Sequence, residues 1–489
     1  MFGYIFEQWD GINIFNDRWS WTLQFLDLSI NNLTTLNGLE KFSFRHLNMS
    51  YNPLFSIEIN HFKQAAGFFD TLISLDLSHT SVSDESTYMF KECKVLEKLI
   101  LVGCPISKLK ITLPSSLTYL DITLFDIQNV EQRSFDEVYA LEDMYVSNYK
   151  MCCPQVIGTS IPPHVCHIQD SEAISSCDDL IREPLLRIFI WIVGLFALAG
   201  NLIVIVYRLK ERNLQTGYEL FVLNLSCSDL LMGVYLIIIA QADAKFRGSY
   251  IWHDDTWRHG LGCQLAQFCS SLSSEASSIF IFLITVDRFL VIKFPFGQFR
   301  LSPRKATLCC VAAWTVSVLI AIVPLLPFSP RWDTYTSSAM CVSLPLTSKR
   351  PPGWLFMVIV FVCFNFLLFV LIACGQFSIY RASSTTRSNV PIASESFARQ
   401  RLEEDLEIAR RLSLIVITDF LCWFPVGVMG LMALNGHELH QDAYAWTAVL
   451  IIPINSAINP ILYTIPILRK KWALFKDKHV SQTLQTRGI

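Results

Sequence analysis

Residues 263–296 read CQLAQFCSSLSSEASSIFIFLITVDRFLVIKFPF, and the interpretation of the whole chain depends on this stretch. It begins with a cysteine, continues as a long apolar segment, and ends in Asp287, Arg288 and Phe289, which a basic segment follows. About 20 apolar residues, each rising about 1.5 Å, are enough to cross the hydrocarbon core of a bilayer. The stretch therefore predicts a membrane-spanning helix with a cysteine at one end and a charged pair at the other.

The composition separates this chain from ordinary soluble proteins. Of its 489 residues, 52% are hydrophobic and only 17% are charged. The apolar excess lies mostly after residue 184, which predicts a soluble part followed by a membrane part. A net charge of −3 excludes a strongly basic nucleic-acid-binding protein. No spacing in the chain is typical of a nucleophile–base pair, a metal site or a phosphate-binding loop, so we do not expect an enzyme.

Six segments in the first 151 residues share the pattern L-x-x-L-x-L-x-x-N-x-L. Their starts lie 21 to 28 residues apart, a spacing typical of leucine-rich repeats. The alternating leucines bury one face of a short strand, and the asparagine side chain satisfies backbone groups where the chain turns. The segments are 23–33, 44–54, 72–82, 96–106, 117–127 and 141–151.

The asparagine position of the repeat is not always an asparagine. Asn31 and Asn52 occupy it, and Cys104 is an accepted substitute. Thr80 and Phe125 depart from the pattern, which predicts irregular turns at these two places.

The strand residues between the leucines line the concave face of such a solenoid, which is the usual binding surface of a repeat protein. They form a mostly acidic stripe that suits a basic peptide. An aspartate in the phrase L-D-L is also common for reasons of solvation alone, and the sequence supports the two interpretations about equally. The acidic stripe consists of Asp27, Asn48, Asp76, Ile100, Asp121 and Tyr145, with Asp143 beside the last of them.

Two further features fit an extracellular location for the repeats. Asn32-Leu33-Thr34 and Asn48-Met49-Ser50 are sequons for N-glycosylation. Residues 152–183 form a hinge that contains four cysteines, and in an oxidising compartment these predict two disulfides. Three pairings are open, and we expect the hinge to connect the last repeat to the first membrane helix. The hinge cysteines are Cys152, Cys153, Cys166 and Cys177.

Seven apolar spans follow the hinge, at about 184–208, 218–241, 264–292, 306–326, 354–380, 408–434 and 443–464. Lys and Arg gather in the loops on one side, so the positive-inside rule places the repeats outside the cell and the carboxyl terminus in the cytosol. We therefore expect a multidomain membrane protein with four parts. They are an extracellular α/β leucine-rich-repeat solenoid at 1–151, the hinge at 152–183, a seven-transmembrane all-α bundle at 184–465, and a cytoplasmic helix and tail at 466–489.

The spans carry polar and aromatic motifs which, taken together and in order, resemble those of rhodopsin-like G-protein-coupled receptors. They are Gly200-Asn201 in the first span, Asp229 in the second, Asp287-Arg288-Phe289 in the third, Trp314 in the fourth, Cys422-Trp423-Phe424-Pro425 in the sixth and Asn459-Pro460-Ile461-Leu462-Tyr463 in the seventh. The resemblance implies a disulfide between Cys263 and Cys341, because that family joins its third helix to its second outer loop in this way.

The resemblance also implies a sodium pocket and an activation switch. A sodium ion at Asp229 is the one cofactor we expect, and an intramembrane charge is a functional candidate by default. Arg288 would be held by Asp287 at rest, with Asp405 as a second candidate partner, and Pro425 would bend the sixth helix. The sodium pocket would consist of Asp229, Ser277, Asn455 and Asn459. The switch residues would be Asp287, Arg288, Asp419, Trp423, Pro425, Asn459, Pro460 and Tyr463.

The fifth span departs from the family pattern. It has no central proline, and Cys374 stands where a tyrosine is often found. Tyr463 would therefore lack its usual partner in the active state.

Within the rhodopsin-like receptors, the chain resembles the relaxin-family peptide receptors. The phrases that carry this likeness are 245–250 (KFRGSY) with Trp257, Ser274-Glu275, 417–423 (ITDFLCW) and 450–463 (LIIPINSAINPILY). The resemblance implies a multi-pass plasma-membrane receptor for a relaxin/insulin-like peptide hormone that signals through a heterotrimeric G protein, with cAMP as the messenger. Arrestin and membrane lipid are further candidate partners. The acidic stripe would bind arginines of the peptide, and the second outer loop around Trp332 would contact the bundle.

Two alternatives remain open at the level of the sequence. A glycoprotein-hormone-type receptor would share Asp419 and the hinge cysteines, although it matches the first outer loop less well. A non-signalling decoy or adhesion protein would bind through its repeats and use the helices only as an anchor. Neither a signal peptide nor a low-density-lipoprotein class A module precedes residue 23, which favours a fragment of a longer protein or a variant that binds without full signalling. The intact Asp-Arg-Phe, CWFP and NPILY motifs favour a signalling receptor.

Overall fold

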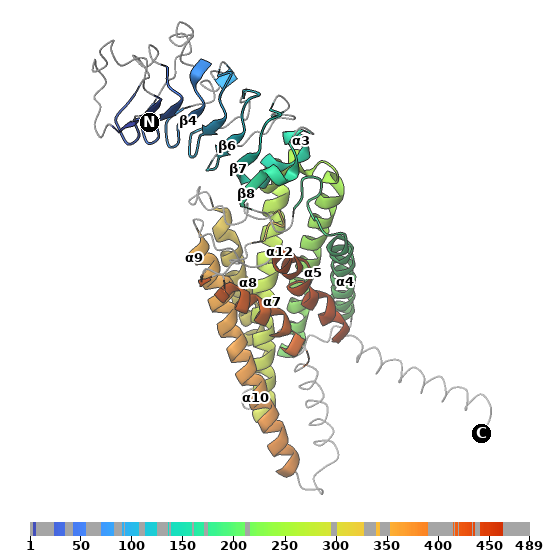
Figure 1. Cartoon of the computed structure of the whole chain (residues 1–489). Helices are drawn as coiled ribbons and strands as arrows, with labels where there is room; N and C mark the ends of the chain where they lie inside the picture. The colour runs from blue at the N-terminus through green and yellow to red at the C-terminus, as the bar shows by residue number, and fades with distance from the viewer. Residues whose placement is uncertain are drawn as a thin grey trace, which may run out of the picture. The chain divides into compact units, whose positions relative to one another are not determined.

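The computed structural model describes residues 3–5, 24–34, 43–54, 70–82, 90–91, 93–106, 113–124, 135, 138–158, 161–170, 175–210, 216–294, 301–326, 339–342, 353–389, 414, 416–418, 420–432, 434–435 and 441–462. The chain divides into two compact units, Met1–Glu172 and Ala173–Ile489, and each is described by itself (Figure 1).

The first unit is a solenoid built on an eight-stranded parallel sheet in which each strand pairs with the next along the chain (Figure 1). The central residues of the strands are paired in register and point inward, from Leu26 to Met144, and none of them is more than 2% exposed. The strands are β1 Gly3–Ile5, β2 Phe25–Asp27, β3 His46–Asn48, β4 Ser74–Asp76, β5 Lys98–Ile100, β6 Tyr119–Ile122, β7 Asp143–Asn148 and β8 Cys166–Asp170.

The sheet extends beyond the six repeats that the leucine pattern predicts. β1 precedes the first of them, and β8 lies inside the segment that we assigned to the hinge, so the solenoid does not end at residue 151. β8 pairs with β7 through its backbone, and that pairing needs no leucine, which explains why the pattern missed it. Between the two strands lie η3 Tyr149–Cys152, α3 Pro154–Ile157 and η4 Pro163–Val165, and a Cys152–Cys166 disulfide joins η3 to β8.

The turns after β2 to β5 are held by side chains at the asparagine position. The amide nitrogen of Asn52 donates to the carbonyls of Leu28 and Met49 at 2.9 and 3.0 Å, and it is 2% exposed. The expected irregular turn at Thr80 is wrong, because its hydroxyl donates to the carbonyl of Leu77 at 2.6 Å and so replaces the amide. The thiol of Cys104 reaches the same carbonyl at 3.1 Å. Phe125, the other departure from the pattern, lies outside the described residues.

The described residues of the second unit contain seven helical segments, which confirms the predicted seven-helix bundle (Figure 1). The first four are α4 Pro184–Lys210, α5 Gly217–Phe246, α7 Leu261–Lys293 and α8 Pro303–Ile322, which η6 Val323–Leu325 continues. The fifth consists of α9 Trp354–Met357, the π-helical turn η7 Val358–Phe364 and α10 Asn365–Asn389. The sixth is Val416–Met432, and the seventh runs from α12 Gln441–Trp446 through the π-helical η8 Thr447–Ile451 to Leu462. Two short helices, η5 Tyr250–Trp252 and α6 Asp254–Arg258, lie between α5 and α7.

α7 differs from the four most apolar helices in that its middle is polar. Among the described residues, Pro184–Lys210, Gly217–Phe246, Pro303–Leu325 and Trp354–Ala382 are long and apolar enough to cross a membrane. α7 instead packs against α5, α8 and α10, and its polar middle is buried. Because protein surrounds α7, its polar side chains meet other side chains rather than lipid. The buried polar residues of that middle are Ser270, Ser271, Ser273, Ser274, Glu275 and Ser278.

Candidate functional site

The predicted acidic stripe is a single row across the sheet. Strand pairing places Asp27, Asn48, Asp76, Ile100 and Asp121 opposite one another in successive strands. Tyr145 and then His167 continue the row on β7 and β8. Sequence reasoning missed His167, because it lies in the segment assigned to the hinge.

Each aspartate of the stripe uses one oxygen locally. The Oδ1 atoms of Asp27, Asp76 and Asp121 accept hydrogen bonds from the backbone N–H two residues later, at 2.9, 2.9 and 3.0 Å. No described residue donates a hydrogen bond to the second oxygen of these carboxylates, and all three residues are half-buried. The two interpretations of the L-D-L phrase are therefore compatible, since one oxygen stabilises the turn and the other remains available to a ligand.

The far end of the acidic stripe is aromatic rather than acidic. Tyr145 lies 5.5 Å from Tyr119 and stacks on His167 at 4.8 Å between ring centroids. The Nε2 atom of His167 is 3.0 Å from Oδ1 of Asp143, and the Lys98 ammonium lies 4.5 Å from the centre of the Tyr119 ring. Burial, with the nearby Asp121, raises the pKa of Tyr119. This end therefore consists of three aromatic rings and the carboxylate of Asp143.

One predicted glycosylation site lies on the acidic stripe. Asn48 stands between Asp27 and Asp76 in the row, and its Oδ1 atom accepts from the N–H of Ser50 at 3.0 Å. The other sequon residue, Asn32, is exposed beyond the turn. A glycan on Asn48 would project from the face that the peptide is expected to use, so the two predictions compete there.

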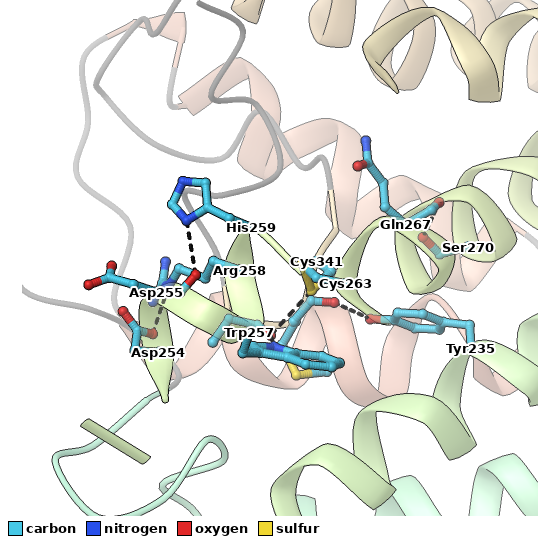
Figure 2. Close-up of a disulfide and its surroundings, with 12 residues drawn as sticks. Tyr235, Asp254, Asp255, Trp257, Arg258, His259, Cys263, Gln267, Ser270 and Cys341 are labelled. Atoms are coloured by element: carbon cyan, nitrogen blue, oxygen red, sulfur yellow. Dashed lines mark hydrogen bonds and ion pairs between the residues drawn. A yellow bond between two sulfur atoms is a disulfide. The ribbon is translucent and has the colours of Figure 1, made fainter. Parts of the chain in front are cut away.

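The segment 339–342 is buried in the core cluster that contains Cys263, and this part of the bundle is here called the disulfide end (Figure 2). The structure contains the implied Cys263–Cys341 disulfide. Beside it, the indole N–H of Trp257 donates to the carbonyl of Ala339 at 2.8 Å, and the hydroxyl of Tyr235 donates to the carbonyl of Met340 at 3.1 Å (Figure 2). The segment is thus fixed at three consecutive residues.

A buried ionic cluster lies at the start of α4 and the end of α5. Arg187 places Nη2 2.7 Å from Asp179 and Nε 3.0 Å from Asp243, which is 0% exposed. The backbone N–H of Ile181 donates to Asp243 at 2.9 Å, and Arg247 lies 3.3 Å from the same carboxylate. Asp179, Ile181, Arg187, Asp243 and Arg247 are called the Arg187 cluster below. Sequence reasoning missed it, because Asp243 resembles an ordinary charged residue at a helix end.

Asp229 is the centre of a polar site between three helices. Its Oδ1 atom accepts from the hydroxyls of Ser277 and Ser456 at 3.1 and 3.0 Å. Its Oδ2 atom accepts from the amide of Asn459 at 2.8 Å. Ser456 was not predicted, whereas the predicted Asn455 is buried one residue earlier. A carboxylate and two hydroxyls are hard oxygen ligands, so these side chains fit a sodium ion, which would neutralise the buried charge.

Asp287 and Arg288 form an ion pair at the other end of α7. Arg288 donates from Nε and Nη2 to Oδ2 of Asp287 at 3.1 and 2.6 Å. Its guanidinium also lies 4.5 Å from the centre of the Tyr218 ring. Both residues are buried, at 3% and 6% exposed. This is the arrangement expected for the resting state, and its role as a switch stays a prediction.

Trp423 lines a small cavity in the middle of the bundle. The cavity has about 10 Å³ of free space, which is about enough for one water molecule. It is therefore too small for an organic ligand in this structure. Pro425 lies in the same helix. The other lining residues include Tyr235, Ser271, Ser274, Val342 and Phe361.

Several predictions fall on residues that the structure leaves undescribed. They concern Trp332, Asp405, Asp419 and Tyr463, and these four residues lie outside the described ranges.

Cys153 and Cys177 of the hinge are both disulfide-bonded.

Comparison with known proteins agrees with this geometry. Residues 200–463 match the family described as 7 transmembrane receptor (rhodopsin family). The chain is 38% identical over 334 residues to the G-protein coupled receptor GRL101 of Lymnaea stagnalis, covering 68% of this chain and 29% of that protein. It is 30% identical over 355 residues to relaxin receptor 2 of Canis lupus familiaris, covering 72% and 46%. Relaxin receptor 1 of Mus musculus is 29% identical over 329 residues, covering 66% and 42%.

The matched stretch spans less than half the length of each of these relatives. The family match, by contrast, covers more than half of this chain and contains the Asp229 site, the Asp287–Arg288 pair and Trp423. The chain belongs to the rhodopsin family of seven-transmembrane receptors.

Proposed function

We propose that the chain is a plasma-membrane receptor for a relaxin/insulin-like peptide hormone. It binds the hormone on the acidic stripe and signals through a heterotrimeric G protein. The observation that carries this proposal is the combination of two features in one chain. One is a row of carboxylates that keep an oxygen for a partner, and the other is a rhodopsin-family bundle in which Asp287 holds Arg288. The relaxin receptors among the relatives support this ligand class.

The chemistry of the acidic stripe favours a basic peptide. A carboxylate whose first oxygen is fixed by its own backbone is oriented before the ligand arrives, so little is lost in ordering it. Guanidinium groups donate strong charge-assisted hydrogen bonds to such oxygens. The aromatic end at Tyr119 and Tyr145 would accept an apolar or cationic side chain on its ring faces.

Contacts at the disulfide end would connect the hinge to the interior of the bundle. The backbone N–H groups of Tyr250 and Ile251 donate to the carbonyls of Asp178 and Cys177, each at 3.1 Å. The hinge residues and the first outer loop would therefore move together. Trp257, which follows in that loop, holds the segment 339–342 above the cavity of Trp423. Hormone binding would shift this segment, and the bundle would shift to the state that binds a G protein.

In this proposal the repeats lie outside the cell and the Asp287–Arg288 end lies in the cytosol, where the G protein, and arrestin after it, would bind. The apolar faces of α4, α8 and α10 would meet membrane lipid. Release of Arg288 from Asp287 would open the G-protein site, and cAMP would be the messenger.

Asparagine substitution separates the charge of the acidic stripe from its structural role. Asn48 makes the same bond to the backbone N–H two residues later that the aspartates make, at 3.0 Å. D27N, D76N and D121N should therefore keep the turns and remove the charge. Because each substitution creates an Asn-x-Ser/Thr sequon, Ser29, Ser78 and Thr123 are also changed to alanine, both in these variants and in the reference chain, and their backbone N–H donors remain. Asp70, an exposed residue 3.7 Å from Lys94, provides the matched control D70N.

The experiment measures surface binding of labelled relaxin-like peptides and cAMP in cells that express the whole chain. We expect the triple variant D27N/D76N/D121N to bind at least about tenfold more weakly, a loss of about 1.4 kcal/mol, while D70N binds as the wild type does. Binding without any second-messenger response would identify a decoy and refute the signalling part. Neither binding nor response would refute the ligand class.

A further inference from the structure

The fifth helical segment contains a π-helical turn where the sequence has no residue that demands one. The turn is η7, Val358–Phe364, and its sequence VIVFVCF contains neither proline nor glycine. Sharp irregularities in helices have identifiable causes, and π-helical turns are frequent at functional sites. A contact outside the turn must therefore favour this conformation over the regular α-helix.

That contact is made by the side chain of Asn365, the first residue after the turn. Its Nδ2 atom donates to the carbonyl of Val360, inside the turn, at 3.3 Å. The same atom donates to Oε1 of Glu275 on α7 at 3.1 Å. One amide group thus bridges the irregular backbone and the neighbouring helix. Glu275 is 0% exposed and Asn365 is 6% exposed, so water does not compete for these bonds.

The bridge is incomplete. Oε2 of Glu275 and Oδ1 of Asn365 are both buried, and neither accepts a hydrogen bond from a described residue. A buried polar network that is only partly satisfied is less stable than a complete one. The π-helical turn is therefore held through one amide donor in a network that is only partly satisfied.

The turn lies between the cavity and the Asp287–Arg288 end. Phe361, in the turn, lines the cavity together with Trp423. Beyond the turn, α10 approaches α7 at Gly375, where an added Cβ would lie 2.7 Å from Cγ2 of Thr285. Gln376 donates to the hydroxyl of Thr285 at 3.3 Å, two residues before Asp287. A rotation of α10 below the turn would break this second contact.

We propose that Asn365, held by Glu275, is a positioning residue that keeps the π-helical turn in the resting receptor, and that activation converts the turn into α-helix. The conversion releases one residue from the turn, and each residue of an α-helix corresponds to a rotation of about 100°. It would change the face that α10 presents to Thr285 and thereby loosen the end that holds Arg288. The link to activation rests on the proposed function, whereas the link between Asn365 and the turn does not.

Three variants test the bridge, and one matched variant serves as the control. N365A removes the donor, and E275L removes its acceptor. E275Q keeps an acceptor oxygen for Asn365 and replaces the buried second carboxylate oxygen with an amide group. Q376A removes a second polar contact between the same two helices, outside the turn, and it is the control.

The first measurement is hydrogen–deuterium exchange of the backbone amides at 358–365 in the whole purified chain, which requires neither hormone nor G protein. We expect N365A and E275L to change this exchange at least threefold, and E275Q and Q376A to leave it near the wild-type rate. The double variant N365A/E275L should match each single one, because both act through the same contact. Unchanged exchange in N365A, or an E275Q that behaves as E275L does, would overturn the proposal.

The second measurement is hormone-independent nucleotide exchange by purified G protein. We expect N365A and a deletion of Val362, which removes the extra residue of the turn, to raise basal exchange about threefold or more. Altered amide exchange with no change in basal coupling would refute the link to activation and leave the bridge intact. A chain that couples to no G protein in any variant would instead refute the proposed function, so the two failures are distinguishable.

Discussion

The aspartates of the two units differ in how much of their bonding capacity the fold uses. On the acidic stripe, Asp27 and Asp76 are half-buried and give one oxygen to their own turn. In the bundle, Asp229 and Asp243 are 0% exposed and both oxygens of each are engaged. A charge that keeps contact with water can be offered to a ligand at little cost. A charge inside the bundle is part of the fold, so its removal disturbs the structure first.

The largest effect is expected at the Arg187 cluster. D243N removes a buried charge that faces two arginines and leaves Arg187 paired with Asp179 alone; breaking the buried Arg187–Asp243 pair should cost about 3–5 kcal/mol of stability. The unfolding temperature of the purified chain and the amount of the chain at the cell surface should both fall. R247A is the control, because Arg247 is half exposed and its removal leaves Arg187 paired. If D243N proved as stable as the wild type, the contrast between the two units would not hold.

The next effect concerns the Asp229 site. D229N keeps a hydrogen-bonding side chain of the same size and removes the charge that a sodium ion would neutralise. We expect sodium chloride, compared with an equal concentration of choline chloride, to raise the unfolding temperature of the wild type and not that of D229N. S456A, which removes the hydroxyl that sequence reasoning missed, should weaken the sodium effect only in part. An equal response of wild type and D229N would argue against a sodium site here.

The acidic stripe should show the opposite behaviour. The triple variant D27N/D76N/D121N loses peptide binding in the proposal above, yet its unfolding temperature should stay within about 2 °C of the wild type, because surface substitutions usually change stability by less than about 0.5 kcal/mol. The salt dependence of peptide binding should decrease as well. A large loss of stability would mean that these carboxylates serve the fold rather than a ligand.

The two sequons sharpen the contrast on the first unit. If the acidic stripe binds peptide, Asn48 should carry no glycan, because it lies between Asp27 and Asp76. N32Q should then lower the apparent mass of the chain in a gel by one glycan, and N48Q should not. Loss of a glycan in N48Q would place sugar on the stripe and contradict the proposed binding face.

The smallest effect is expected at His46, which stacks on Phe25 at 4.0 Å between ring centroids. Burial lowers the pKa of His46, and the neighbouring Arg45 lowers it further. The unfolded chain therefore takes up a proton at a higher pH than the folded one, so stability falls slightly as the pH drops below about 6.5. H46Q should lose less stability than the wild type between pH 7.5 and pH 5.5, as measured by thermal unfolding. An equal loss of stability in H46Q and in the wild type would contradict a contribution of His46 to the pH dependence.

Most of the architecture could be predicted from local patterns. The leucine spacing located β2 to β7, and the apolar spans matched the seven helical segments, because both signals depend on residues that are near in sequence. The leucine spacing did not predict β8, because the position of β8 depends on backbone pairing with β7 rather than on leucines. The turn at Thr80 was expected to be irregular, but a hydroxyl can donate to the same carbonyl that the asparagine serves.

The sites divide in the same way. The sequence by itself determined the family, through motifs such as Asp287-Arg288 and the CWFP phrase, and it determined which residues carry unusual charge in an apolar span. Only the tertiary structure decided that Ser456 joins Asp229, that Arg187 pairs with Asp243, and that Asn365 bridges Glu275 and a π-helical turn. These contacts join residues 56 to 227 positions apart. Their partners depend on how helices pack against one another, and no local periodicity records that choice.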